Sequence, residues 1–150
     1  MSIHDEIPAQ LLPTGNHTFL LPNATVAEIV RHVTLLPTNN SNPPPWVIGD
    51  FMWQGQPVPL ISLDRILDPR IILPPERKCV IVKTLDPKHP RPCYGLLISG
   101  LPQFVNVQKH GLLLDATQDT PPTGIRMAVL VAGKTALIPD LDIIDSLLEH

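Results

Sequence analysis

The sequence predicts a mainly β protein built from small closed barrels, with one short helix between strands and another at the C-terminus. Nineteen prolines among 150 residues are too many for long helices, so the chain must be rich in turns and edge strands. Short apolar runs alternate with turn signals about every ten residues, as in all-β proteins. Because proline blocks strand edges and closure removes them, barrels are favoured over open sheets.

Nine short strands follow from these runs, within one domain spanning residues 1–150 whose first six residues are expected to be flexible. The strands divide into two groups around a helix and loops at residues 24–45. Cys79 and Cys93 each sit beside strand-type sequence and are expected to be buried free thiols rather than a disulfide. The strands are expected at residues 7–12, 18–21, 46–53, 56–63, 79–85, 93–99, 104–107, 125–132 and 135–138.

A short connecting helix is predicted after Pro22. Thr25 and Glu28 have capping-box spacing at its start. Its apolar residues recur at i, i+3, i+4 and i+7 and form one stripe about two turns long. This stripe either packs over a sheet or forms an exposed docking surface. Its members are Val26, Ile29, Val30 and Val33.

The C-terminal helix is predicted to begin after Asp140, which is a suitable N-cap residue. Its buried stripe is expected to contain Leu141, Ile144, Leu147 and Leu148. The acidic residues Asp142, Asp145 and Glu149 are expected to face water. A single helical turn is also expected over residues 62–67, and an exposed turn over residues 86–92.

The most specific local signal is a hairpin over residues 46–63. Two strand-type runs are separated by Gln54-Gly55, and glycine supplies the positive φ that tight primed turns need. Pro57 and Pro59 should then point their nitrogens away from the first strand, and they make the second strand a poor template for further pairing. The second strand therefore belongs at an edge or at a barrel seam. The expected pairs are Trp53 with Gln56, Phe51 with Val58 and Gly49 with Leu60.

Composition disfavours several function classes. A net charge of −3 with 4% aromatic residues gives no footprint for nucleic acid. No apolar run approaches the roughly 20 residues of a membrane-spanning helix, and no signal peptide is visible, so we expect a cytoplasmic protein without membrane insertion. The six histidines never have metal-ligand spacing, and no phosphate-binding loop or nucleophile elbow occurs. We therefore expect no metal, no cofactor and no enzymatic activity.

Surplus apolar side chains gather in the first hairpin strand. Trp46, Ile48 and Met52 should lie on one face, and Val47, Phe51 and Trp53 on the other. Only one face of a short strand fits inside so small a barrel. The remaining side chains should line either a seam between two barrels or a protein interface, where Trp and Met are favoured.

The same stretches resemble the CheW-like domain family. The resemblance rests on Val26–Ile29, Leu36-Pro37, Pro45–Gly49, Gln54–Leu63 and Ile138–Leu141, and it covers nearly the whole chain from about residue 7. The run LLPNATVAEIV is especially similar to the ChpC-type chemosensory adaptors of systems that govern type IV pili and twitching motility. The resemblance implies two intertwined five-stranded SH3-like barrels that enclose a hydrophobic core.

The resemblance also implies an adaptor without catalysis. Its partners would be the regulatory domain of a CheA-type histidine kinase, bound through barrel edges, and the cytoplasmic tip of a chemoreceptor near the groove between the barrels. Two positions depart from the family pattern. Gln54 stands where the family hairpin usually has Arg, and Ser99 stands where it has Asp. Gln cannot copy the bidentate pairing of a guanidinium, so a specialised partner is plausible.

The leading hypothesis is therefore a cytoplasmic adaptor that couples a chemoreceptor to a CheA-type kinase. The alternative is a small-ligand-binding β-barrel, which requires a sizeable apolar pocket with a few convergent polar groups. A nucleic-acid-binding barrel ranks third because of the acidic charge balance. Under the adaptor hypothesis the expected contact residues are Val26, Ile29, Phe51, Trp53, Gln54 and Gly55.

Overall fold

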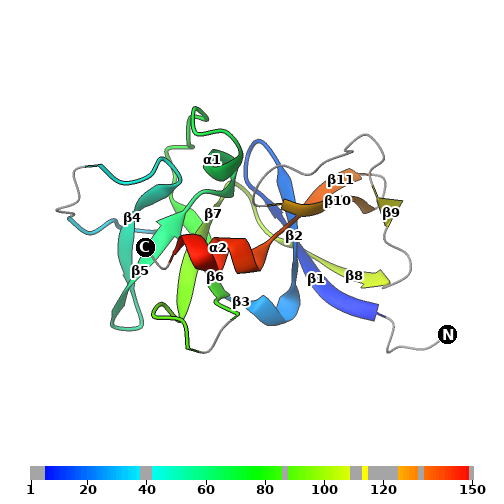
Figure 1. The fold of residues 1–150 in the computed structure, drawn as a ribbon, viewed down its shortest axis with the longest axis horizontal. Helices are drawn as coiled ribbons and strands as arrows, with labels where there is room; N and C mark the ends of the chain where they lie inside the picture. Colours follow the sequence, from blue (N-terminus) through cyan, green and yellow to red (C-terminus); the bar gives the residue numbers. More distant parts are fainter. Residues whose placement is uncertain are drawn as a thin grey trace.

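A computed structural model of the chain describes residues 6–37, 42–85, 88–108, 113–114, 125–131 and 134–148. Two β-sheets lie side by side along the long axis of the molecule (Figure 1). The six-stranded sheet runs in the order β8 (Gln103–Gln108), β1 (Glu6–Pro13), β2 (Thr18–Pro22), β11 (Lys134–Pro139), β10 (Ile125–Val131), β9 (Leu113–Leu114). The five-stranded sheet runs in the order β3 (Val26–Val30), β6 (Lys78–Lys83), β7 (Cys93–Ile98), β5 (Gln56–Ile61), β4 (Val47–Trp53).

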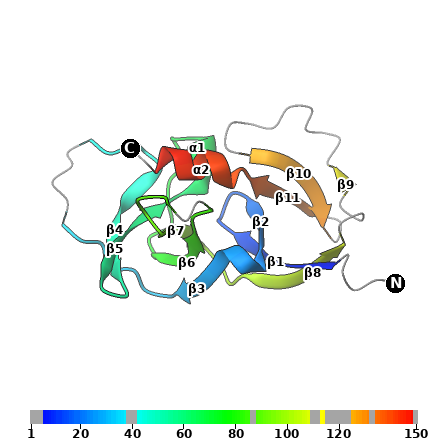
Figure 2. The same ribbon diagram turned by 60° about the horizontal axis from the view of Figure 1, so that its bottom comes forward.

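The two sheets are intertwined in the sequence. The chain begins with β1 and β2 in the six-stranded sheet and then forms all five strands of the other sheet, β3 to β7. It returns to the six-stranded sheet with β8, β9, β10 and β11 (Figure 2). A parallel pairing of Phe19 in β2 with Leu137 in β11 joins the two ends of the chain. The predicted mainly β, double-barrel fold is confirmed. Residues 1–5, whose flexibility was expected, lie outside the described residues, and Glu6 already belongs to β1.

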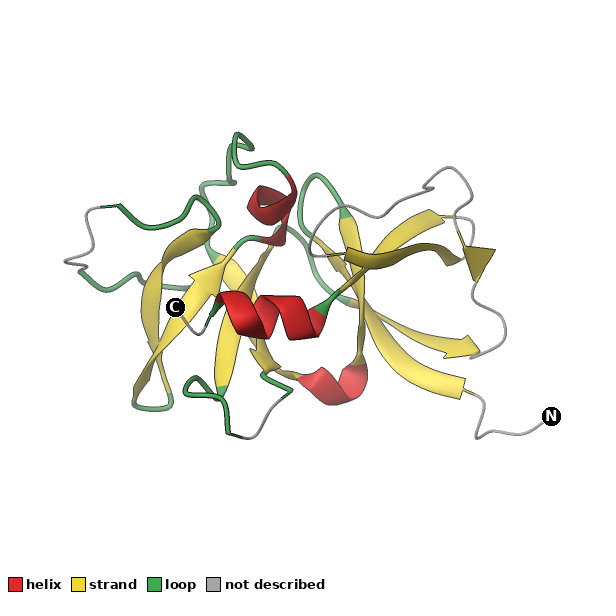
Figure 3. Ribbon diagram, viewed as in Figure 1, coloured by secondary structure: helices red, strands yellow, loops and turns green. Residues whose placement is uncertain are grey.

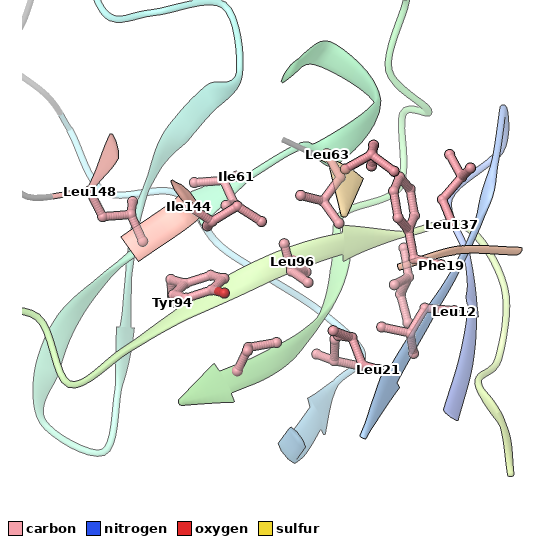
Figure 4. Packing of buried hydrophobic residues seen from close by; sticks show 14 of the residues in the cluster. Leu12, Phe19, Leu21, Ile61, Leu63, Tyr94, Leu96, Leu137, Ile144 and Leu148 are labelled. Carbon is pink, nitrogen blue, oxygen red and sulfur yellow. The ribbon is translucent and has the colours of Figure 1, made fainter. Parts of the chain in front are cut away.

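Three apolar clusters hold this arrangement together. The largest lies between the sheets, where Phe19 and Leu21 of β2 meet Tyr94 and Leu96 of β7 (Figure 4). A second cluster fills the inside of the barrel that the five-stranded sheet forms, and a third fills the inside of the barrel that the six-stranded sheet forms. In β6, alternate residues serve different clusters, and so the run 79–82 is apolar throughout rather than alternating.

The predicted helix over residues 25–33 is wrong. Only Asn23–Thr25 form a turn of 3-10 helix, and Val26–Val30 form β3, which pairs antiparallel with β6. The Thr25 hydroxyl donates to the Pro22 carbonyl oxygen. Two turns of helix are too short to be stable alone, and β-branched residues gain more from pairing beside β6. A bulge between Val26 and Glu28 disturbs the strict alternation that marks a strand, which explains the helical appearance of the sequence.

Besides the 3-10 turn, the described residues form two short α-helices, and all of these segments are red in Figure 3. The first, α1 (Leu63–Leu67), is the helical turn expected after the hairpin, and the Ser62 hydroxyl accepts from the Arg65 N–H at its start. The second, α2 (Leu141–Leu147), begins as predicted at Asp140, whose carboxylate accepts from the Ile143 N–H. Ile144 and Leu148 of this segment enter the cluster between the sheets.

One face of α2 differs from the prediction. Asp145 was expected to face water, but it is buried and accepts a hydrogen bond from the Leu85 N–H at 2.8 Å. His89, in a loop predicted to be exposed, is also buried, with its Nε2 2.7 Å from the Asp145 carbonyl oxygen. The β6–β7 loop therefore packs against α2 through polar contacts that helix periodicity alone does not reveal.

Candidate functional site

The β4–β5 hairpin has the register expected from its sequence. Trp53 pairs with Gln56, Phe51 with Val58 and Gly49 with Leu60. On its other side β5 pairs in parallel with β7, but only at Leu60 and Ile61, after both prolines. The second strand of the hairpin thus forms a seam, one of the two predicted positions, and β4 is the outer strand of its sheet.

The turn at the end of this hairpin is held in an uncommon backbone conformation. Gln54 has φ of 50° and Gly55 has φ of 79°, so both central residues are left-handed, as in a primed hairpin turn. Glycine accepts this conformation without a steric penalty, whereas glutamine does not. A strained non-glycine residue at an exposed apex is typical of sites that are kept for function.

A side-chain contact fixes the base of this tip. The Trp53 indole N–H donates to the Glu28 carboxylate, which ties the end of β4 to β3. A hollow of about 300 Å³ lies beside the indole, and Ala27, Gln54 and Gln56 are among the residues that line it. We call the group formed by the exposed Met52, Gln54 and Gly55 and the half-buried Trp53 the hairpin-tip surface.

The structure divides the six expected contact residues into three groups. Trp53, Gln54 and Gly55 lie together at the hairpin tip. Val26 and Ile29 lie on β3, the outer strand at the other end of the strand order, which the Trp53–Glu28 contact relates to the tip. They pair with Val82 and Val80 of β6, whose side chains belong to the cluster between the sheets. Val26 is half-buried, and Ile29 is 36% exposed.

Phe51 occupies a different position from the other five. It is only 2% exposed, because its ring lies inside the five-stranded sheet and packs over Gly95 of β7. It therefore anchors the hairpin and offers no surface to a partner in this conformation. A bulge between Val47 and Gly49 also turns Ile48 toward the same interior cluster as Phe51, whereas strict alternation predicted opposite faces.

A second candidate surface lies between the two sheets, where the family resemblance places a groove between the barrels. We call it the inter-barrel cleft, and its volume is about 560 Å³. The β1–β2 turn and β11 contribute residues from one sheet, while Leu67 at the end of α1 and Ser99 after β7 come from the other. Ser99, the position that departs from the family's Asp, donates its N–H to the Pro13 carbonyl oxygen at 2.9 Å.

A buried carboxylate supports the wall of this cleft. Asp64 of α1 is 2% exposed and receives three side chains from the β1–β2 turn. The Thr14 hydroxyl donates to Oδ1 at 2.7 Å, and the His17 Nδ1 lies 2.8 Å from the same oxygen. The Asn16 amide donates to Oδ2 at 3.4 Å. These contacts fasten one sheet to the other, since α1 follows β5 whereas the turn belongs to the six-stranded sheet.

The cysteines do not supply reactive groups to either surface. Both are buried and free of a disulfide, as predicted. Burial raises the pKa of the Cys79 thiol to about 12 and also raises the pKa of Cys93. A thiolate is therefore disfavoured at neutral pH, and the nucleophilic form of cysteine is the thiolate. Within the residues that the structure describes, no cluster of three metal-ligating side chains occurs and no helix is long and apolar enough to cross a membrane.

Comparison with known proteins agrees with this architecture. The family model of the CheW-like domain matches residues 10–147. Among solved structures, the chain is similar to the scaffolding protein TtCheW from Thermoanaerobacter tengcongensis, with a TM-score of 0.70 and 16% sequence identity. That similarity covers 90% of this chain and 89% of the other. A search of curated protein sequences gave no match.

Proposed function

Because the chain belongs to the CheW-like domain family, we propose that it is a non-enzymatic, cytoplasmic adaptor that couples a chemoreceptor to a CheA-type histidine kinase. The observation that carries this proposal is the hairpin-tip surface. Its apex is exposed, its backbone is fixed in a left-handed turn, and its indole is held by Glu28. A rigid aromatic anchor of this kind loses little conformational freedom on binding.

The two candidate surfaces suit two different partners. The hairpin tip lies at the end of the outer strand β4, and this barrel edge is where we place the regulatory domain of the kinase. The inter-barrel cleft is concave and lined by both sheets, and there we place the receptor tip. Separate surfaces allow one adaptor to hold both partners at once. Val26 and Ile29 extend the kinase surface along β3.

We further propose that the adaptor belongs to a chemosensory system that controls type IV pili and twitching motility. This proposal rests on the similarity of residues 20–30 to ChpC-type adaptors. Gln54 in place of Arg supports a specialised partner, because an amide presents one donor group and one acceptor where a guanidinium presents a charged fork.

The small-ligand alternative gains no support from the barrel interiors. Side chains fill the inside of the five-stranded sheet, with Phe51, Leu60 and Ile81 at its centre. Leu20, Val129 and Ala136 fill the described part of the other sheet in the same way. An enclosed apolar pocket with convergent polar groups, which a small ligand requires, is therefore not present in either described interior.

Replacing Trp53 with alanine should weaken capture of the CheA-type kinase by an affinity-tagged chain. Loss of a central aromatic anchor typically costs about 2 kcal/mol or more, which is at least a tenfold loss of affinity. The measurement is the dissociation constant for the purified kinase regulatory domain, with a thermal melt to show that the variant is folded.

Phe104→Ala is the control, because it also truncates an aromatic side chain, one that is 69% exposed and lies on β8 in the other sheet. It should bind as the unchanged protein does. If Trp53→Ala lowers the melting temperature, Gln54→Lys tests the same surface through a side chain outside the core. If the unchanged protein, Trp53→Ala and Gln54→Lys all bind the kinase regulatory domain with equal affinity, the hairpin tip is not part of the interface.

A further inference from the structure

A basic groove lies on the five-stranded sheet, away from the turn of the hairpin. It is formed where the chain leaves β3, at residues 31–34, and where it enters β6, at residues 75–78. The Val33 N–H donates to the Arg77 carbonyl oxygen at 2.9 Å and holds the two segments together. The groove has a volume of about 630 Å³, and Leu101 closes one side.

The charges of this groove oppose the charge of the whole protein. Arg31, Arg77 and Lys78 are basic residues and His32 stands beside them, whereas Glu76 is the acidic residue among the lining groups. The whole chain has a net charge of −3. Within the described residues, neither arginine nor the lysine forms a salt bridge with a carboxylate. The Arg77 guanidinium donates to the Pro74 carbonyl oxygen, which fixes its position in the wall.

The groove also has an apolar component. Leu101 is 66% exposed, and Val33 is half-buried beside it. Concentrated positive charge next to an exposed leucine is complementary to a segment that carries both acidic and apolar side chains. A flat membrane surface fits a concave groove poorly, and no Phe, Tyr or Trp lines it for the stacking of nucleic acid bases.

We propose that this groove binds an acidic, amphipathic segment of a partner protein. Arg31, Arg77 and Lys78 pair with carboxylates of that segment, and an apolar side chain of the segment covers Leu101. The groove lies outside the hairpin-tip surface and the inter-barrel cleft, so the inference stands whether or not the hairpin tip binds a kinase.

The test uses fluorescence anisotropy of a labelled glutamate-rich peptide with interspersed leucines, titrated with the full chain at low salt. We expect saturable binding that weakens as salt is raised, since exposed charges are screened within about 10 Å at 0.1 M ionic strength. A peptide with glutamine in place of each glutamate should not bind. The double variant Arg31→Glu with Lys78→Glu should lose about tenfold or more in affinity, because it places like charges opposite the peptide.

The matched control, Arg70→Glu with Lys134→Glu, changes the net charge by the same amount at two exposed sites elsewhere. Its affinity for the peptide should lie within about twofold of that of the unchanged protein. If charge reversal unfolds the first variant, Arg31→Gln with Lys78→Gln replaces it. Three results would each overturn the proposal: no peptide binding at low salt, equal loss in the control variant, or tighter binding to phosphatidylserine vesicles than to the acidic peptide.

Discussion

Replacing Asp64 with alanine is expected to lower the free energy of unfolding by about 2–4 kcal/mol. The carboxylate is buried and accepts from Thr14, Asn16 and His17, so its removal leaves donors of the β1–β2 turn without their partner. The loss should also loosen the connection between the two sheets, because Asp64 is supplied by α1 and its donors by the other sheet. Urea denaturation followed by circular dichroism measures the effect.

Two further variants distinguish the loss of the Asp64 hydrogen bonds from the loss of a carboxylate charge in general. Asp64→Asn keeps one acceptor oxygen of similar shape and should cost less than the alanine variant. Asp50→Ala removes an exposed carboxylate from β4 and should change stability by less than about 0.5 kcal/mol. A change of similar size for Asp64→Ala and Asp50→Ala would show that the buried network does not fasten the sheets.

Replacing Gly95 with alanine is expected to destabilise the five-stranded sheet by about 1–3 kcal/mol or more. A Cβ at this position would lie 2.9 Å from Cε1 of Phe51 and 3.1 Å from Sγ of Cys79. Both neighbours are buried, so neither can move aside cheaply. The displaced Phe51 ring would carry β4 with it, and kinase capture through the hairpin tip should fall as well.

A double-variant cycle tests the cause. Phe51→Leu alone removes ring atoms from the core and is destabilising, but combined with Gly95→Ala it makes room for the added methyl group. We expect the double variant to be more stable than the sum of the two single effects predicts, as judged by urea denaturation. Simple additivity would mean that the clash with Phe51 is not the source of the loss.

Local chemistry explains which parts of the fold the sequence predicts. Gln54-Gly55 and the alternating Pro57 and Pro59 specify the hairpin and its register, because turn geometry and missing donors act between near neighbours. Asp140 specifies the start of α2 in the same way. The pairing of β2 with β11 is a relation between chain ends, and no local pattern in the sequence reveals it.

Tertiary contacts account for the parts of the fold that the sequence does not predict. Residues 26–30 carry a helical period, yet the neighbouring β6 stabilises them as a strand. Asp64 and Thr14 are 50 residues apart, so the cluster of polar residues in the β1–β2 turn shows no partner in the sequence. Phe51 is apolar like Trp53 and lies two positions away, but only the packing against Gly95 shows that one is buried and the other reaches the tip.

The most direct measurement is co-purification of the affinity-tagged chain from its native cell, with the retained proteins identified by mass spectrometry. We expect a CheA-type histidine kinase and a chemoreceptor with the unchanged protein, and loss of the kinase with Trp53→Ala while Phe104→Ala retains it. Recovery of neither protein, or of the kinase in equal amounts with both variants, would contradict an adaptor that works through the β4–β5 hairpin.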